Sequence, residues 1–116
     1  MEVKFCKMHG LGNDFVVLEA LRQQVRVTPT LIRKIADRHR GIGCDQLLLI
    51  EPPSQQDLDF DFRYFNPDGN EVEQCGNGIR CMARFLYDEN LIGKSSLKVK
   101  KMKVILDILI TKDKSI

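Results

Sequence analysis

The sequence predicts an α+β fold, in which a mostly antiparallel sheet wraps around a central helix. Several short segments alternate apolar with polar residues, as half-buried strands do, whereas two others repeat apolar residues every three or four positions, as helices do. The two kinds of segment are mixed along the chain, which favours the α+β class. With 116 residues, 43% of them hydrophobic, and no internal repeat or low-complexity linker, residues 1–116 fit a single domain.

Four segments before residue 66 have the composition of strands, and residues 96–116 alternate again and are predicted to form one or two more. The first and last of the four alternate apolar with polar residues, and the middle two are apolar runs typical of buried strands. A pair of prolines, Pro52 and Pro53, ends the third segment. The four are VKFCKM (3–8), FVVLEA (15–20), CDQLLLIE (44–51) and LDFDFRYF (58–65).

Two segments are predicted to be helical. In the first, Thr28 is a candidate N-cap, Pro29 occupies the first helical position and Gly41 follows the end. Its apolar face comprises Leu31, Ile32, Ile35 and Ala36. The second helix has apolar residues at positions 79, 82, 83 and 86, which form one stripe, and it is expected to end near Gly93.

Charge and composition exclude several classes of function. A net charge of +2 is too near balance to indicate nucleic acid as a partner. No apolar run approaches the roughly 20 residues that span a bilayer, and no signal peptide follows Met1, so we expect a cytoplasmic protein without a membrane partner. The four cysteines form no CxxC pair and the two histidines lie 30 residues apart, so we expect reduced thiols and no metal site.

One cysteine occupies a position that can lower its pKa. In EVEQCGNGIRCMARF (71–85), Cys75 directly precedes Gly-Asn-Gly and the predicted second helix. The amides and the positive end of the dipole at a helix N-terminus stabilise an anion, and Gly76 and Gly78 leave room for a small ligand. The segment therefore fits a reactive thiolate beside a carboxylate site. An alternative interpretation is a simple Asn-Gly turn with Cys75 as a small core residue.

Several motifs together resemble the N-terminal half of diaminopimelate epimerases. They are KMHGLGNDF, RHRGIGCDQLLLIE and FNPDGNEVEQCGNGIRC, and the resemblance extends from about residue 4 to residue 93. It implies an isomerase of lysine and peptidoglycan biosynthesis that interconverts LL- and meso-diaminopimelate without pyridoxal phosphate or another cofactor. In that family two cysteine thiols act as acid and base from opposite faces of the substrate α-carbon, and Cys75 matches one of them.

The resemblance also implies the substrate-binding residues. The side-chain amides of Asn13, Gln46 and Asn66 match family residues that contact substrate, and Gly76 and Asn77 match those whose backbone amides bind the α-carboxylate. Asparagine and glutamine amides both donate and accept, so they suit the two ends of a zwitterion. Alternatively, Asn13 and Asn66 lie in turn sequences, where such side chains often satisfy their own backbone.

The second thiol is not expected within this sequence. On a helix Cys81 would lie about 9 Å and roughly 120° from Cys75, so the two cannot flank one carbon. The family's second cysteine belongs to a second, similar half, and residues 94–116 depart from the family pattern, which suggests a truncated, split or frameshifted chain. Two alternatives remain: a non-catalytic fragment that docks on a partner half, or a relative resembling proline racemases.

The C-terminal segment predicts association. Residues 94–116 carry seven lysines and two aspartates, a net charge of +5, whereas residues 1–93 carry −3. Within this segment VILDILI (104–110) has high β propensity and a single charge, and we expect Ile108 to lie on an exposed apolar face. The sequence thus predicts a homodimer, or association with a complementary C-terminal half.

Overall fold

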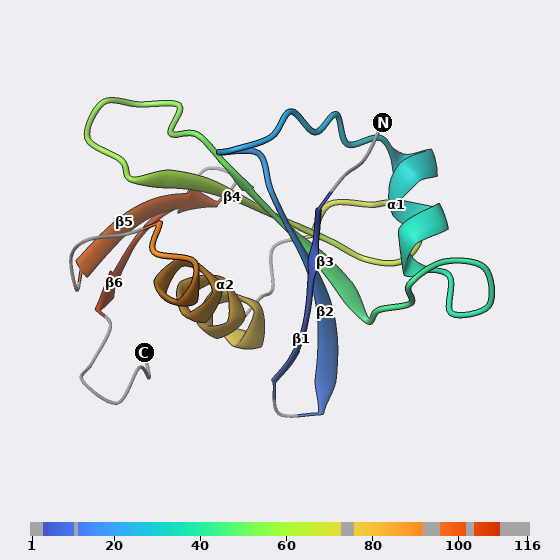
Figure 1. Ribbon diagram of the computed structural model, residues 1–116. Helices are drawn as coiled ribbons and strands as arrows, with labels where there is room; N and C mark the ends of the chain where they lie inside the picture. Colours follow the sequence, from blue (N-terminus) through green and yellow to red (C-terminus); the bar gives the residue numbers. More distant parts are fainter. Residues whose placement is uncertain (1–3, 11, 73–75, 92–95, 102–103, 110–116) are drawn as a thin grey trace.

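The computed structural model describes residues 4–10, 12–72, 76–91, 96–101 and 104–109, which form one sheet and two helices (Figure 1). Along the described chain the strands are adjacent in the sheet in the order β1-β2-β3-β4-β5-β6. The elements are β1 (Cys6–Gly10), β2 (Asn13–Glu19), α1 (Pro29–Ala36), β3 (Gln46–Glu51), β4 (Phe60–Phe65), α2 (Gly76–Asp88), β5 (Ser96–Lys101) and β6 (Val104–Leu109).

The sheet is mixed, with three antiparallel pairs and two parallel pairs. β1 with β2, β3 with β4 and β5 with β6 are antiparallel, whereas β2 with β3 and β4 with β5 are parallel. Each parallel pair is joined by a helix, α1 in the first case and α2 in the second. Because the second parallel pair runs opposite to the first, crossovers of the usual right hand put the two helices on opposite faces.

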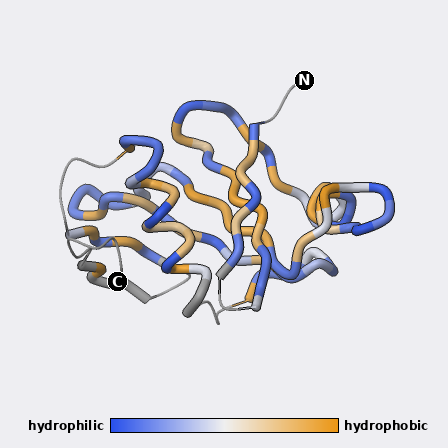
Figure 2. Tube along the Cα trace, turned by 60° about the horizontal axis from the view of Figure 1, so that its bottom comes forward, coloured by the Kyte–Doolittle hydropathy of each residue, from blue (hydrophilic) through white to orange (hydrophobic). Residues whose placement is uncertain are grey.

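α2 is the central helix that the sequence predicts. Its fully buried residues Met82 and Leu86 pack in the main core with alternate residues of the sheet, among them Phe15, Leu48 and Phe62. In Figure 1 the helix lies between β5 and β6 on one side and β1 and β2 on the other. Figure 2 shows the apolar residues gathered in the central strands and the polar ones in the loops. The α+β prediction with a wrapped helix is confirmed.

α1 covers the other face of the sheet through a smaller core. Ile32 and Ala36 are buried there against the alternate residues of β2 and β3, which include Val16 and Leu47. The predicted cap is confirmed, since the Leu31 amide donates to Thr28 Oγ1 at 3.1 Å. Below the helix the chain turns sharply: a Cβ atom on Gly41 would lie 1.9 Å from the Lys34 carbonyl oxygen.

α2 ends earlier than the apolar pattern indicates. The helix stops at Asp88, and Asn90 adopts the left-handed conformation with φ 55°. The amide of Leu91 donates to the Leu86 carbonyl at 2.9 Å, and that of Asn90 donates to the Tyr87 carbonyl at 3.1 Å, which is a Schellman cap. The cap at Asn90 therefore ends the helix after Asp88 and not near Gly93, where the sequence predicted its end. Leu91, the residue after Asn90, packs against the main core.

β6 corrects one expectation from the sequence. Ile108 is 4% exposed and belongs to the main core, so the prediction that it lies on a bare apolar face is wrong. The cause is its partner: β5 pairs antiparallel with β6 so that Leu97, itself buried, lies opposite Ile108, and both strands turn this face toward α2. Residues 110–116 lie outside the described residues. Among those described, no helix is both long and apolar enough to span a membrane.

Candidate functional site

The sheet brings three of the predicted site residues to one edge. Asn13 and Gln46 are the first residues of the neighbouring parallel strands β2 and β3. Asn66 directly follows β4, which runs antiparallel to β3 with Phe65 opposite Leu47. Strand register thus gathers three side-chain amides that are up to 53 positions apart in the sequence.

Gln46 has the environment of a binding residue. Its Oε1 atom is buried and has no hydrogen-bond partner among the residues that the structure describes. A buried acceptor without a partner costs free energy, so such atoms are uncommon outside sites that bind something. The residue is therefore a physically reasonable ligand contact, and its role in binding substrate stays a prediction.

Asn66 begins a tight turn. Two backbone hydrogen bonds close this turn, and the side chain that accepts a hydrogen bond within it is that of Asp68. The backbone amide of Asn66 donates to the backbone carbonyl of Asn70, and the backbone amide of Gly69 donates to the backbone carbonyl of Asn66, each at 3.0 Å. The carboxylate that caps this turn belongs to Asp68, which accepts from the Asn70 amide at 2.9 Å. The turn-satisfying role considered for Asn66 is thus filled by Asp68.

The first turn of α2 supplies the remaining predicted groups. α2 begins at Gly76, so the backbone amides of Gly76 and Asn77 fall among the four that have no acceptor within the helix. Figure 1 draws this turn toward the same end of the molecule as the turn between β1 and β2. Cys75 itself lies outside the described residues, and its role as acid and base stays a prediction.

The other three cysteines are poorly placed to act as bases. Cys44 and Cys81 are 2% and 5% exposed, and Cys6 is half-buried beside the main core. Burial raises the pKa of all three thiols, and Glu89 and Asp88 raise that of Cys6 further. They are held as neutral thiols, and Cys81 packs in the main core.

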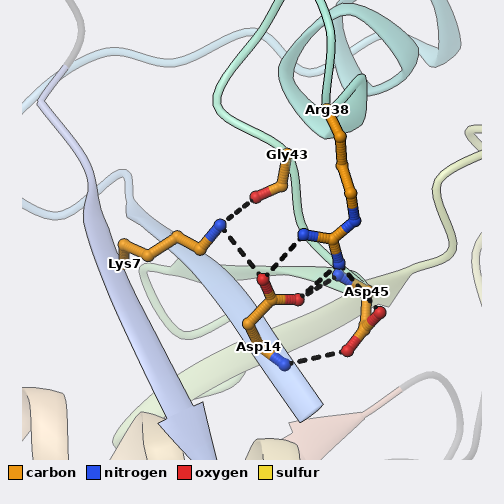
Figure 3. Close-up of polar contacts among 5 residues, drawn as sticks. All are labelled: Lys7, Asp14, Arg38, Gly43 and Asp45. Carbon is orange, nitrogen blue, oxygen red and sulfur yellow. Dashed lines mark hydrogen bonds and ion pairs between the residues drawn. The ribbon is translucent and has the colours of Figure 1, made fainter.

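Sequence reasoning missed a group of charged residues next to the predicted amides. Asp14 follows Asn13 and Asp45 precedes Gln46, and both carboxylates accept from the guanidinium of Arg38 (Figure 3). Lys7 forms an ion pair with Asp14 at 3.1 Å and donates to the Gly43 carbonyl oxygen. The signal was present in the motifs GND and CDQ, where an aspartate adjoins each amide.

Two of the hollows that described residues line can be compared with the predicted site. One, of about 380 Å³, is lined by His9, Gly12, Asn13, Asp14, Arg38 and Asp45, at the edge where the predicted residues gather. The larger, of about 790 Å³, lies between β1 and the end of α2, with Cys6, Glu19 and Glu89 in its wall, and contains none of the predicted site residues. Within the described ranges no group of acidic, histidine or cysteine side chains is arranged to hold a metal ion.

Comparison with known sequences gives a consistent result. The family described as "Diaminopimelate epimerase" matches residues 5–116. A diaminopimelate epimerase of Azoarcus sp. (strain BH72) is 56% identical over 100 residues, which cover 86% of this chain and 36% of that protein. One of Teredinibacter turnerae is 48% identical over 116 residues, covering 100% of this chain and 42% of the other. The chain thus spans about two fifths of the length of these relatives.

Solved structures with a similar fold have low sequence identity. A methylitaconate-delta-isomerase matches 99% of this chain and 36% of its own, with a TM-score of 0.70 and 15% identity. A Bacillus anthracis protein of the phenazine biosynthesis PhzF family matches 97% of this chain and 36% of its own, with a TM-score of 0.65 and 21% identity. At such identity the likeness establishes the fold alone.

Proposed function

The chain belongs to the diaminopimelate epimerase family, and from that premise we propose that residues 1–116 supply one half of an epimerase site for LL- and meso-diaminopimelate. One observation carries the proposal: strand register gathers Asn13, Gln46 and Asn66 at one edge of the sheet, with a buried acceptor on Gln46 that has no hydrogen-bond partner among the described residues. In this proposal residues 1–116 are equivalent to the N-terminal half of a two-domain epimerase.

These groups suit an amino acid that carries both charges. Amide oxygens accept from an ammonium group, and amide N–H groups donate to a carboxylate. The first amides of α2, from Gly76 and Asn77, point outward along the helix axis, where the dipole favours an anion. We assign the α-carboxylate to these amides, and the Gln46 Oε1 atom to a donor on the substrate.

The acid and base chemistry is assigned to Cys75. As a thiolate it removes the α-proton and becomes a thiol, while the electron pair left on the α-carbon is stabilised by the amides around the carboxylate. Inversion then requires a proton from the opposite face. A second thiol, from a half of the site outside this sequence, donates that proton and is left as a thiolate.

The alternative is a non-catalytic binding fragment, which would keep the amides of Asn13, Gln46 and Asn66 and dock on a partner half. Both versions propose association, either as a homodimer or with a complementary C-terminal half. Sedimentation of the purified chain at micromolar concentration tests this part. A monomer, both alone and with the C-terminal part of the Azoarcus relative, would rule association out.

The activity is tested with the isolated chain and with a chimera that joins it to the remaining part of the Azoarcus relative. In D2O with LL-diaminopimelate, we expect the isolated chain to show little inversion, because no opposite-face donor is present. The chimera should epimerise the substrate, and Cys75→Ser in the chimera should abolish turnover. Cys81→Ser is the control, since Cys81 is a core residue of α2 and has no assigned role in the reaction.

Two outcomes would contradict the mechanism. Rapid inversion by the isolated chain would require a second base within residues 1–116 or across a dimer. Full activity of the Cys75→Ser chimera would remove Cys75 from the reaction. Unchanged substrate affinity of an active chimera that carries Gln46→Leu would contradict the proposed binding site.

A further inference from the structure

Two aspartates hold the starts of β2 and β3 together through reciprocal hydrogen bonds. The backbone amide of Asp14 donates to Asp45 Oδ2 at 3.0 Å. In return the backbone amide of Asp45 donates to Asp14 Oδ1 at 2.7 Å and to the Asp14 carbonyl oxygen at 3.0 Å. These bonds continue the parallel ladder by one step beyond its first paired residues, Phe15 and Gln46.

This arrangement brings two carboxylates close together. Arg38 is the cation that bridges both of them, and Lys7 adds a second positive charge on Asp14 alone, at 3.1 Å. Arg38 donates to both Asp14 carboxylate oxygens, at 2.9 and 3.0 Å, and its Nη2 atom also donates to Asp45 Oδ1 at 3.0 Å (Figure 3). Its hydrogen bonds are the main reason that the pKa of Asp14 lies well below its usual range. The Asp14 carboxylate therefore stays ionised as an acceptor at neutral pH.

The two aspartates lie directly beside the residues that are assigned to substrate binding. Each aspartate is covalently joined to a residue assigned to substrate, Asp14 to Asn13 and Asp45 to Gln46. Asp14 has a side chain that is only 13% exposed, so it is held in the fold, whereas Arg38 is 53% exposed and reaches both aspartates from the turn after α1. Among the contacts described at these strand ends, the Arg38 side chain contacts both aspartates, whereas Lys7 pairs with Asp14.

We propose that Arg38, acting through Asp14 and Asp45, is a positioning residue that sets the separation of Asn13 and Gln46 for substrate binding. This inference rests on the proposed function, which assigns the two amides to substrate. Without the guanidinium, the two carboxylates repel each other and the reciprocal bonds lengthen, so the two amides no longer meet one ligand together. The expected effect is a loss of affinity that exceeds any loss of fold stability.

The test uses the purified 116-residue chain, labelled with ¹⁵N, and meso-diaminopimelate as the titrant. Arg38→Gln removes the charge and Arg38→Lys keeps it. The matched control is Arg22→Gln, because Arg22 is 49% exposed and also joins two acidic side chains, Glu19 at 2.8 Å and Glu89 at 3.0 Å, away from the predicted amides. Melting temperature, ligand Kd and the side-chain amide signals of Asn13 and Gln46 are measured for each variant.

We expect Arg38→Gln to raise Kd at least tenfold and to move both amide signals, whereas Arg22→Gln changes Kd less than twofold for a similar fall in melting temperature. Arg38→Lys should recover part of the affinity. If the wild type binds and Arg38→Gln binds equally well, the positioning role is wrong while the proposed function stands. If neither the wild-type chain nor the wild-type chimera with the remaining part of the Azoarcus relative binds, the proposed function fails, and side-chain amide signals of Asn13 and Gln46 that Arg38→Gln leaves unmoved then overturn the positioning role separately.

Discussion

Replacing Gln46 by leucine should make the chain more stable and less able to bind substrate. The buried Oε1 atom without a described partner costs roughly 1–3 kcal/mol relative to a solvated or paired acceptor. Leucine has a similar size and no acceptor, so most of this cost disappears on substitution. Allowing for imperfect packing of the branched side chain, we expect a gain of about 1 kcal/mol in the free energy of unfolding.

For a chain of this length, a gain of about 1 kcal/mol raises the melting temperature by roughly 4 °C and the urea midpoint by about 0.5 M. Urea unfolding followed by far-UV circular dichroism measures the change. Binding of meso-diaminopimelate to the same variant should weaken at least tenfold, because the substrate loses its hydrogen bond to the amide. Stability and affinity therefore change in opposite directions, as is common at binding sites.

Gln56→Leu is the control, because Gln56 lies in an exposed loop between β3 and β4, where no buried acceptor is relieved. This variant should leave both the urea midpoint and the affinity unchanged. A Gln46→Leu chain that is less stable than the wild type would mean that the Oε1 atom is already satisfied. Unchanged affinity in that variant would refute the assignment of Gln46 to the substrate.

Three further predictions concern a thiol, a turn and acid stability. Cys75 should react with iodoacetamide faster than the other three cysteines, whose pKa values are raised by burial; peptide mapping that finds another cysteine labelled first would contradict this. Gly43→Ala should lower the free energy of unfolding by roughly 1–3 kcal/mol more than Gly12→Ala. Both glycines have positive φ, but a Cβ atom at Gly43 would lie 2.8 Å from Arg38 Cγ, whereas one at Gly12 would meet no atom within 4 Å. Equal melting temperatures of the two variants would refute the clash. The pKa of Asp14 is lower in the folded state, so its contribution to stability is present above about pH 4 and is lost as pH falls. Asp14→Asn should therefore flatten the acid side of the plot of stability against pH. An unchanged plot would show that Asp14 does not cause the loss of stability in acid.

Much of the local structure is determined by residues that are close together in the sequence. Thr28 and Pro29 begin α1 because an N-cap hydroxyl and a preset φ act within one turn, and the structure confirms the bond from the Leu31 amide. Alternation likewise indicated β4, since successive residues of a strand face opposite ways. The family resemblance was also recognisable from the sequence, because its motifs are short and contiguous, and the comparison over residues 5–116 confirms it.

Pairing between distant segments was decided by the tertiary structure alone. Local periodicity does not say which strands are parallel, so it did not indicate that helices join the two parallel pairs and lie on opposite faces. It also misjudged Ile108, because whether one face of a strand is exposed depends on the register with β5 and on the position of α2. Strand direction, the side on which each helix lies and the burial of Ile108 all depend on contacts between distant residues, which form only when the whole sheet is assembled.

The candidate site shows the same division. The motifs GND, CDQ and FNPDG were enough to predict Asn13, Gln46 and Asn66 as site residues, because each motif is local. The ion pairs around Arg38 were not foreseen, since Arg38 and Asp14 lie 24 positions apart and meet only because β2 and β3 are neighbours. A charged side chain on a turn has many possible partners in the sequence, and the register of two parallel strands selects among them.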